Sequence, residues 1–440
     1  MSHKIWQKNN STSNEHADIV GNFTVGHDRE FDLQLARYDV LGSLAHAEML
    51  VSIGLLTSKE GQQIHQALQE ILQEIATGQF VLEASVEDIH SQIEFLLTQR
   101  IGEAGKKIHS GRSRNDQVLV DLKLFMRYEL EEITRSVQTL FHELIALSEK
   151  NKRHLLPGYT HLQLAMPSSF GLWFGAYAES LTDDLEMLRA AHAVCNKNPL
   201  GSGAGYGSSF ALNRTLTTEL LQFDTLNYNV VYAQMTRGKT EKLMAMSMAT
   251  VAATLARLAY DICLYMNQEF ALVSFPDSLT TGSSIMPHKK NPDVFELIRA
   301  RCNRIQALPN ELTLLTSNLP SGYHRDVQLT KECLFPAIES LKQCLSMTTF
   351  MLQHIEIKEN ALASSHFDIL FSVEEVNREV REGVAFRDAY KNIAEAIESN
   401  TFHPTKEIHH THEGSMGNLC NDKIVEQFNQ VVRQILKNQG

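Results

Sequence analysis

One segment of the sequence combines residue types that suit proton transfer on a carboxylate-bearing substrate. Residues 281–293 read TGSSIMPHKKNPD, in which Gly282 and two serines form a polar loop. Asn291 is a good helix N-cap and Pro292 suits the first helical position, so we expect a helix to start there. Lys289 and the positive end of that helix would then stabilise developing negative charge. A flexible basic loop in front of a capped helix is the alternative.

A second segment, residues 109–117, reads HSGRSRNDQ and lies just before a long helical pattern. The guanidinium groups of Arg112 and Arg114 present paired donors that match the two oxygens of a carboxylate. Asn115 adds a neutral donor beside them. By itself, this segment is also what a capped helix start with exposed arginines looks like.

Two further polar segments lie between helical patterns. Residues 157–163 read PGYTHLQ, where His161 could act as an acid or a base near neutral pH. An isolated histidine is, however, more often structural. Residues 321–331 read SGYHRDVQLTK, a polar loop that could equally be solvated surface. Neither segment alone therefore distinguishes a functional site from a structural or surface loop.

Two other patterns are typical of cofactor sites but lack features that such sites need. The glycine-rich run at 199–207 has no Gly-Lys-Ser/Thr ending and precedes no βαβ unit, so we exclude nucleotide binding there. A group of histidines near the carboxyl terminus lacks the cysteine or carboxylate spacing of a metal site. These are His403, His409, His410 and His412. We therefore expect no metal and no organic cofactor.

The composition indicates what kind of scaffold positions these segments. The chain has 440 residues, with 10 Pro, 23 Gly and 43% hydrophobic residues, which favours long uninterrupted helices. A net charge of −12 excludes a general nucleic-acid binder but permits a small basic pocket. The six cysteines form no CxxC motif and are typical of free thiols. Without an apolar signal core or a charge-free helical run long enough for a membrane, we expect a cytoplasmic protein.

Helical periodicity predicts a mainly α protein with a long central bundle. The predicted bundle helices cover about 116–150, 168–194, 240–271, a stretch from 291 onward, and 336–353. The third of these is apolar on nearly every side, which is typical of a core helix. Shorter helices are expected on either side of the bundle. We therefore divide the chain into a helical domain at 1–112, the bundle at 113–360 and a second helical domain at 361–440.

Taken together, the four polar segments resemble the argininosuccinate lyase family of the fumarase/aspartase superfamily. The superfamily's signature loop is similar to GSSIMPHKKNP at 282–292, where His288 replaces the usual glutamine. The family's other patterns are similar to GRSRNDQ, GYTHLQ and the spacing of Tyr323, Gln328 and Lys331. The resemblance covers nearly the whole chain in consistent order. It implies a three-domain fumarase/aspartase-like fold.

The resemblance also implies an activity: reversible cleavage of argininosuccinate to arginine and fumarate, in arginine biosynthesis, through an aci-carboxylate carbanion. In the family, the base is the first serine of the loop, here Ser283. His161 would be the acid for the departing guanidino nitrogen, or would position the group that is. Lys289 and Asn291, helped by Arg114, would share the charge of the intermediate, because one oxyanion donor is worth only roughly 2.7–4 kcal/mol.

The other residues taken from the resemblance would orient a catalytic side chain or bind the substrate. Glu296 lies about one turn into the new helix and would orient His161 or Lys289. The carboxylates and the arginine end would be bound by Asn115, Thr160, Tyr323, Gln328 and Lys331. No serine in the early loop at 24–28 aligns with the family's substrate-binding serine, and residues 4–7 lack the usual Gly-Gly-Arg-Phe, so nothing is carried over from either. In the family, helices from three subunits complete each site of a homotetramer.

Two alternatives stay open on the sequence alone. One is another fumarate-releasing carbon–nitrogen lyase of the superfamily, of the aminopolycarboxylate type, because His288 and Met166 depart from the family pattern. The other is a non-catalytic structural relative, as among the lens crystallins. The presence of all four expected catalytic residues argues against this second alternative.

Overall fold

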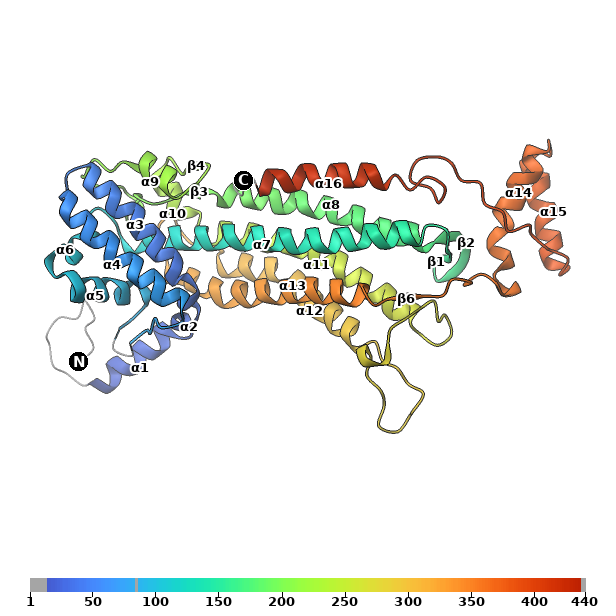
Figure 1. Ribbon diagram of the computed structural model, residues 1–440, viewed down its shortest axis with the longest axis horizontal. Coiled ribbons are helices and arrows are strands. Elements are labelled where there is room, and N and C mark those ends of the chain that lie inside the picture. Colours follow the sequence, from blue (N-terminus) through green and yellow to red (C-terminus); the bar gives the residue numbers. More distant parts are fainter. Residues whose placement is uncertain (1–13, 84–85, 437–440) are drawn as a thin grey trace. The chain divides into compact units, whose positions relative to one another are not determined.

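The computed structural model describes residues 14–83 and 86–436, which form a mainly α-helical structure as predicted (Figure 1). These residues divide into two compact units, each built from three separate stretches of chain. Unit 1 comprises Met1–Glu132, Met187–Ala249 and Ile305–Ser340; unit 2 comprises Ile133–Glu186, Thr250–Arg304 and Leu341–Gly440. The three-domain division by chain order stays a prediction, and the departure at residues 4–7 lies outside the described residues.

Five long helices contribute residues to both units. They are α7 (Arg114–Lys150), α8 (Phe170–Cys195), α11 (Lys239–Tyr265), α12 (Asp293–Leu315) and α13 (Thr330–Leu352). The predicted bundle helices are therefore present, although some ends differ. Helix α11 ends earlier than predicted because Asn267 Oδ1 accepts hydrogen bonds from the amides of Glu269 and Phe270, which turns the chain. Helix α13 begins before Pro336, which lies inside it.

The amino-terminal part of unit 1 consists of shorter helices around an apolar core. These are α1 (Asn14–Val25), α2 (Asp28–Asp32), α3 (Ala36–Ser52), α4 (Ser58–Ala76), α5 (Ile89–Ile101) and α6 (Glu103–Lys106). Ile64, Leu68 and Ile71 share one face of α4 and are fully buried against α3 and α5. Unit 1 also holds α9 (Arg214–Leu220), α10 (Val230–Met235) and the parallel pair β3 (Lys197–Asn198) and β4 (Thr225–Leu226).

Helix α4 begins with a reciprocal cap. Thr57 Oγ1 accepts a hydrogen bond from the amide of Glu60 (3.3 Å), and the amide of Thr57 donates to Glu60 Oε2 (2.9 Å). Replacing Thr57 with alanine is expected to lower the free energy of unfolding by about 0.5–2 kcal/mol, because a helix-end amide loses its acceptor. Urea unfolding followed by circular dichroism measures this loss. Ser58→Ala, at the exposed next position, is the control, and equal losses in both variants would contradict the capping role.

Unit 2 contains a β-hairpin that the sequence analysis did not predict. Strand β1 (Leu155–Thr160) pairs antiparallel with β2 (Gln163–Ser169), so the connecting turn consists of two residues. His161 and Leu162 form this turn with φ values of 54° and 59°, as a type I′ turn requires. Positive φ is unfavourable for residues other than glycine. The hairpin therefore holds His161 at its tip in a strained backbone conformation.

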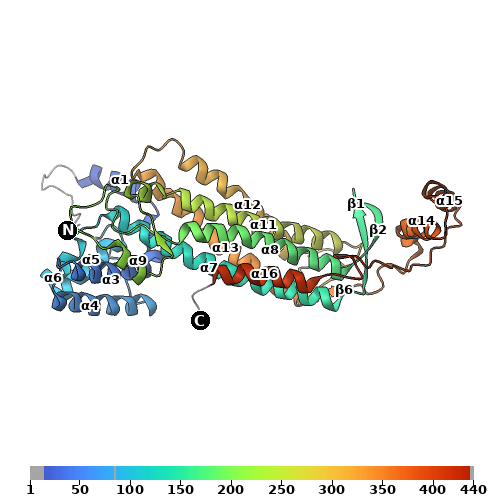
Figure 2. The same cartoon turned by 90° about the horizontal axis from the view of Figure 1, so that it is seen from above.

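The carboxyl-terminal part of unit 2 is fixed to the bundle by its last helix. It contains β5 (Val273–Ser274) paired with β6 (Glu356–Ile357), then α14 (Ser372–Arg381), α15 (Phe386–Glu398) and α16 (Asn421–Ile435). The rings of Phe141 and Phe428 stack with centroids 3.6 Å apart, which packs α16 against α7 (Figure 2). Asn421 Nδ2 donates to Ser148 Oγ (3.0 Å) and Glu149 Oε1 (2.7 Å).

Among the described residues, α11 is the helix that is long and apolar enough to cross a membrane, with a mean hydropathy of 1.3 over 18 residues. A core helix of a soluble protein can have the same length and hydropathy. In this protein 61% of that window is buried. The burial favours the predicted core helix over a membrane span.

Candidate active site

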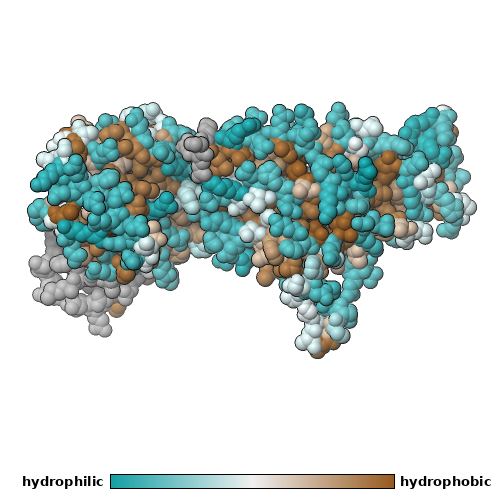
Figure 3. Space-filling view, viewed as in Figure 1, coloured by the Kyte–Doolittle hydropathy of each residue, from teal (hydrophilic) through white to brown (hydrophobic). Residues whose placement is uncertain are grey.

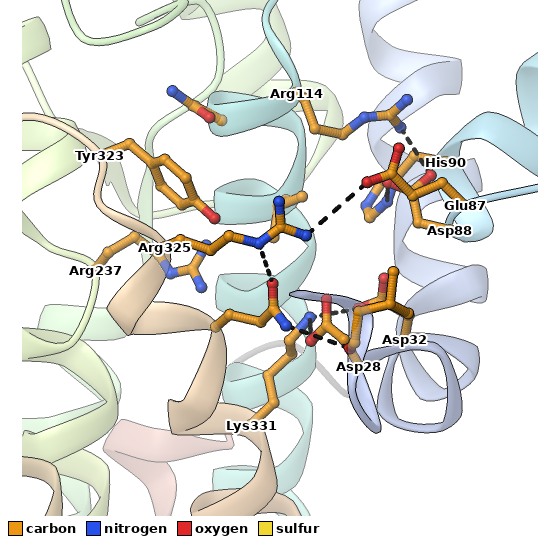
Figure 4. Close-up of a pocket in the computed structure, with 14 residues that line it drawn as sticks. Asp28, Asp32, Glu87, Asp88, His90, Arg114, Arg237, Tyr323, Arg325 and Lys331 are labelled. Carbon is orange, nitrogen blue, oxygen red and sulfur yellow. Dashed lines mark hydrogen bonds and ion pairs between the residues drawn. The ribbon is translucent and has the colours of Figure 1, made fainter. Parts of the chain in front are cut away.

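Unit 1 contains a cavity of about 170 Å³ lined mostly by charged and polar side chains (Figure 4). Of the residues expected to bind substrate, the cavity brings together Arg114, Asn115, Tyr323, Gln328 and Lys331. They come from two stretches of chain that are far apart in the sequence. The cavity therefore unites the second and fourth polar segments.

Two helix starts and a 3-10 helix position these residues. Arg114 and Asn115 lie in the first turn of α7, and Lys331 lies in the first turn of α13. Gln328 belongs to the 3-10 helix η4 (Arg325–Leu329). The expectation of a loop throughout 321–331 was therefore wrong for its second half, where the chain coils into η4 and continues directly into α13.

Lys331 is almost fully buried and bridges two carboxylates of α2. Its Nζ lies 2.5 Å from Asp28 Oδ1 and 2.5 Å from Asp32 Oδ1. Burial, followed by the charge of Asp32, raises the pKa of Asp28 to about 6, although Lys331 acts in the opposite direction. Burial likewise raises the pKa of Asp32. The charge of Arg237 also acts on both carboxylates, in the direction opposite to burial.

Residues 24–28, from which nothing was carried over, also form part of this site. The expectation of a loop there was wrong at both ends, because Thr24 and Val25 end α1 and Asp28 begins α2. Gln328 Nε2 and Arg325 Nη2 each donate a hydrogen bond to the carbonyl oxygen of Thr24, both at 3.0 Å. These hydrogen bonds hold the last turn of α1, and the side chain of Asp28 lines the cavity. The signal that could have identified Asp28 was an acidic residue in the loop where a substrate-binding hydroxyl was expected.

The two arginines of the second segment have different surroundings. Arg114 lines the cavity, where its Nη2 donates to Ser91 Oγ (3.1 Å) and its Nη1 lies 3.6 Å from Asp88 Oδ1. Arg112 is buried, and its Nη1 donates to Ser43 Oγ (2.9 Å). The expectation that both guanidinium groups are available to a substrate carboxylate was therefore wrong for Arg112, whose guanidinium group is hydrogen-bonded in the protein interior.

Sequence reasoning missed most of the other charged residues that line the cavity. They are Asp28, Asp32, Glu87, Asp88, His90, Arg237 and Arg325. The clearest available signal was the spacing of four between Arg237 and Glu241, which places Arg237 in the turn just before α11 and Glu241 in the first turn of that helix. Arg237 Nε lies 3.3 Å from Glu241 Oε1, and both side chains are buried.

A buried trio of metal-ligand residue types lies next to the cavity. The ligand atoms of Asp39, His90 and Asp121 lie within 4.8 Å of one another in the described part of the chain. His90 Nε2 is 2.9 Å from Asp121 Oδ2, and burial raises the pKa of Asp121 well above its usual value. The Arg112 guanidinium opposes the rise for both aspartates, which shows a cation already near them. This cation disfavours a metal ion, so we interpret the trio as a structural network.

In unit 2, the polar loop before α12 folds around the hydroxyl of Ser283. Ser283 Oγ accepts hydrogen bonds from the backbone amides of Ile285 (3.3 Å) and Met286 (3.2 Å). Donors that point at an oxygen stabilise its anionic form more than its neutral form. The loop therefore directs two backbone donors at this oxygen.

Helix α12 starts differently from the prediction. It begins at Asp293, and the carbonyl of Pro292 accepts the hydrogen bond from the amide of Glu296 (3.1 Å). Asn291 does not cap this helix. Its backbone amide instead donates to the carbonyl of Thr281 (2.8 Å) in a short antiparallel bridge. Asn291 thereby ties together the two ends of the Ser283 loop.

A second cavity, of about 570 Å³, lies beside this loop in unit 2. Of the expected site residues it is lined by Lys289, Asn291 and Glu296, and His288 lines it too. Lys290 also lines it but is paired with Asp277. This cavity thus gathers two of the three groups expected to share the charge of the intermediate, Lys289 and Asn291, whereas the third, Arg114, lines the unit 1 cavity.

Thr160 and His161 occupy a third place, the exposed tip of the β1–β2 hairpin. Within the described ranges they line neither of the two cavities. The expected site residues of one chain are therefore grouped in the unit 1 cavity, at the Ser283 loop with its cavity, and at the hairpin tip.

Comparisons of the sequence find relatives along nearly the whole chain. Residues 11–307 match the protein family described as "Lyase". The chain is 57% identical over 432 residues to the argininosuccinate lyase of Bacteroides thetaiotaomicron, which covers 98% of this chain and 96% of the relative. It is 38% identical over 395 residues to the argininosuccinate lyase of Thermotoga neapolitana, which covers 90% and 98%.

Solved structures share the fold at much lower sequence identity. An EDDS lyase variant with bound fumarate matches with a TM-score of 0.74 and 20% identity, covering 98% of this chain and 91% of that one. Class II fumarase from Schistosoma mansoni matches with a TM-score of 0.68 and 16% identity, covering 92% and 91%. These likenesses confirm the fumarase-like helical fold. Together with the full-length relatives, they show that this chain is a lyase and belongs to the argininosuccinate lyase family.

Proposed function

We propose that this chain catalyses the reversible β-elimination of argininosuccinate to L-arginine and fumarate, a step of arginine biosynthesis. The observation that carries this proposal is the 57% identity to an argininosuccinate lyase over 98% of the chain. The two alternatives, another lyase of the superfamily and a non-catalytic relative, are not favoured, because relatives that are 56–58% identical over nearly the whole chain are named argininosuccinate lyases.

The reaction removes a proton from the carbon next to a carboxylate of the succinyl group. The electron pair moves into that carboxylate, which gives an aci-carboxylate carbanion, and the carbon–nitrogen bond then breaks. We assign the base to Ser283, because the amides of Ile285 and Met286 stabilise its alkoxide. His161 supplies the proton that the departing guanidino nitrogen takes up.

The intermediate gathers negative charge that several donors must share. Enzymes commonly lower a barrier by about 8–23 kcal/mol, and one donor supplies roughly 2.7–4 kcal/mol. Lys289 and Asn291 line one cavity and are assigned this role together with Arg114. Glu296 lines the same cavity as Lys289, which supports Lys289 rather than His161 as the group that it orients.

The remaining residues bind the substrate's charged ends. We assign its carboxylates and arginine end to Asn115, Thr160, Tyr323, Gln328 and Lys331. Charged groups of both signs in the unit 1 cavity suit a substrate that carries both carboxylate and ammonium groups. No cofactor takes part in these assignments.

The other partners are further copies of the same chain. Figure 3 shows hydrophobic patches among the hydrophilic surface, and the long helices expose large apolar side chains. These include Met246, Tyr260, Leu314, Met347 and Phe350. We propose that they are covered in a homotetramer whose subunits share active sites, so light scattering should give the mass of four 49.6 kDa chains. The six free cysteines support a cytoplasmic location.

The activity is tested by incubating the purified protein with argininosuccinate and following the ultraviolet absorbance of fumarate. Fumarate and arginine are expected in equal amounts, with arginine identified by chromatography. Addition of EDTA should leave the rate unchanged, because no step uses a metal. Fumarate release from an aminopolycarboxylate but not from argininosuccinate would favour the alternative lyase. Release from neither substrate would favour a non-catalytic relative.

A further inference from the structure

We propose that Asp116 is a positioning residue for the reaction, because its carboxylate fixes the start of α7, which carries Arg114 and Asn115, against the glycine-rich loop at 199–207. The inference rests on the proposed function, in which those two residues are assigned to the intermediate and the substrate. Asp116 is fully buried and is not among the described residues that line the unit 1 cavity. It therefore acts through its two neighbours and not on the substrate itself.

One oxygen of Asp116 holds the start of α7. Asp116 Oδ1 accepts a hydrogen bond from the backbone amide of Ser113 (2.8 Å), the residue directly before the helix. Asp116 is the third residue of α7, and a carboxylate in this position that binds the amide of the cap residue resembles one half of a capping box. The bond closes a short ring of chain that contains Arg114 and Asn115. It thereby fixes the backbone from which both side chains extend.

The other oxygen of Asp116 is bound by the glycine-rich loop. Asp116 Oδ2 accepts hydrogen bonds from the backbone amides of Gly201 (2.9 Å) and Gly203 (2.8 Å). These two glycines have φ values of 84° and 60°, a conformation that few other residues adopt. Backbone amides that converge in this way form a site for an anion. The glycine-rich loop therefore binds a carboxylate of its own chain.

Three backbone amides thus act on the charge of Asp116. Burial raises the pKa of this residue, and the hydrogen bonds from Ser113, Gly203 and Gly201 oppose that rise. An asparagine in its place has one acceptor oxygen and one donor nitrogen instead of two acceptor oxygens. Asp116→Asn would therefore lose its hydrogen bonds on one side, either to the helix start or to the loop.

The loop that receives Asp116 is itself held in place by two other helices. From α10, Gln234 Nε2 donates to Ser202 Oγ (3.1 Å) and to the carbonyl of Gly203 (3.2 Å). From α9, Arg214 Nε donates to the carbonyl of Leu200 (2.9 Å). Because these contacts fix the loop without the help of α7, the loop can serve as an anchor for that helix.

The same loop also lies against the fourth polar segment. A Cβ atom added to Gly322 would lie 3.6 Å from Tyr206 Oη, so the tyrosine of the loop is close to this glycine. Gly322 directly precedes Tyr323, which lines the cavity. The loop therefore approaches both segments that supply the expected substrate-binding residues of this cavity, and Asp116 joins it to one of them.

The first test measures kcat and KM for argininosuccinate in Asp116→Asn. A displacement of about 1 Å can cost roughly 10²-fold, so we expect kcat/KM to fall roughly 10–100-fold. The same replacement should cost at least about threefold less in Arg114→Ala and in Asn115→Ala, because each of these variants lacks a group that Asp116 positions. A smaller loss in only one of the two would identify the neighbour that is positioned. An equal loss in all three backgrounds would overturn the inference, because a purely structural role does not depend on these neighbours.

A second test changes the loop and leaves the residues of α7 intact. Gly203→Ala places a Cβ atom 3.0 Å from the carbonyl oxygen of Gly207 and so displaces an amide that binds Asp116. Gly207→Ala is the matched control, because its φ of 78° is also unfavourable for alanine but no described atom lies within 4 Å of the added Cβ.

The two glycine variants separate positioning from stability. Urea unfolding should show similar losses of stability in both. By contrast, kcat/KM should fall about 3–10-fold in Gly203→Ala and stay within about twofold of the wild type in Gly207→Ala. Equal values of kcat/KM in the two variants would contradict the anchoring role of the loop. Failure of the wild-type protein to cleave argininosuccinate would instead overturn the proposed function.

Discussion

Replacing Ser283 with alanine is expected to reduce the turnover of argininosuccinate by about 10²–10⁴-fold or more. The variant removes the oxygen toward which two backbone amides point, from Ile285 and Met286. These amides cannot take over proton abstraction, because they are donors. The change is measured as kcat, from the initial rate of fumarate formation at saturating substrate.

A neighbouring serine provides the matched control. Ser284 belongs to the same loop and is exposed, and its replacement with alanine should leave most of the turnover. Circular dichroism and light scattering should show unchanged helix content and mass in both variants, because the Ser283 loop is held by the backbone bridge between Thr281 and Asn291. Undiminished turnover by Ser283→Ala would place the base elsewhere in the protein.

Replacing Lys331 with methionine is expected to damage both stability and substrate binding. The side chain is almost fully buried between Asp28 and Asp32, so its loss leaves two carboxylates without their cation. Breaking a buried ion pair by removing one partner typically costs about 3–5 kcal/mol. Urea unfolding at pH 7 should show a loss of this size, and KM for argininosuccinate should rise in the fraction that stays folded.

The same variant should also respond to pH in a defined direction. Burial, followed by the charge of Asp32, already raises the pKa of Asp28 to about 6 with the lysine present. Without the lysine this pKa rises further, so the folded state takes up protons at a higher pH than the unfolded state. The unfolding free energy of Lys331→Met should therefore recover as the pH falls from 7 toward 5.

A double variant tests whether the uncompensated charge is the cause. Lys331→Met combined with Asp32→Asn carries one carboxylate fewer and should regain part of the lost stability at pH 7. If instead the single and double variants were equally unstable, and neither responded to pH, the loss would come from packing rather than from the buried charges.

The helices were predictable because the periodic spacing of apolar residues can be seen within each segment of the sequence. The β1–β2 hairpin was not predictable in this way. Pro157 and Pro167 are cross-strand partners in β1 and β2, and proline is normally read as a sign against a strand. A two-stranded ribbon tolerates them because both of its strands are edges. The turn gave no signal either, because His161 and Leu162 adopt positive φ without a glycine.

The site was predictable where it consists of short motifs, and it was missed where it depends on charges that meet only in the folded chain. The motifs led to Arg114, Gln328 and Lys331, but no local pattern links Lys331 to Asp28 or Asp32. Motifs also do not show whether a side chain points into the protein interior or toward a cavity. Arg112 and Arg114 are two residues apart and equally suited to a carboxylate, yet the first is buried and the second lines the cavity.

The bridge between Lys331 and α2 has a consequence for the timing of biosynthesis. Its partners Asp32 and Lys331 are 299 positions apart, so the ribosome must add that length of chain after the aspartate before the lysine exists. At about 5–20 residues per second this takes on the order of 15–60 s. During that interval α2 emerges with Asp28 and Asp32 lacking the lysine that bridges them. A nascent chain that stops before α13 therefore has no means of closing the charged cavity.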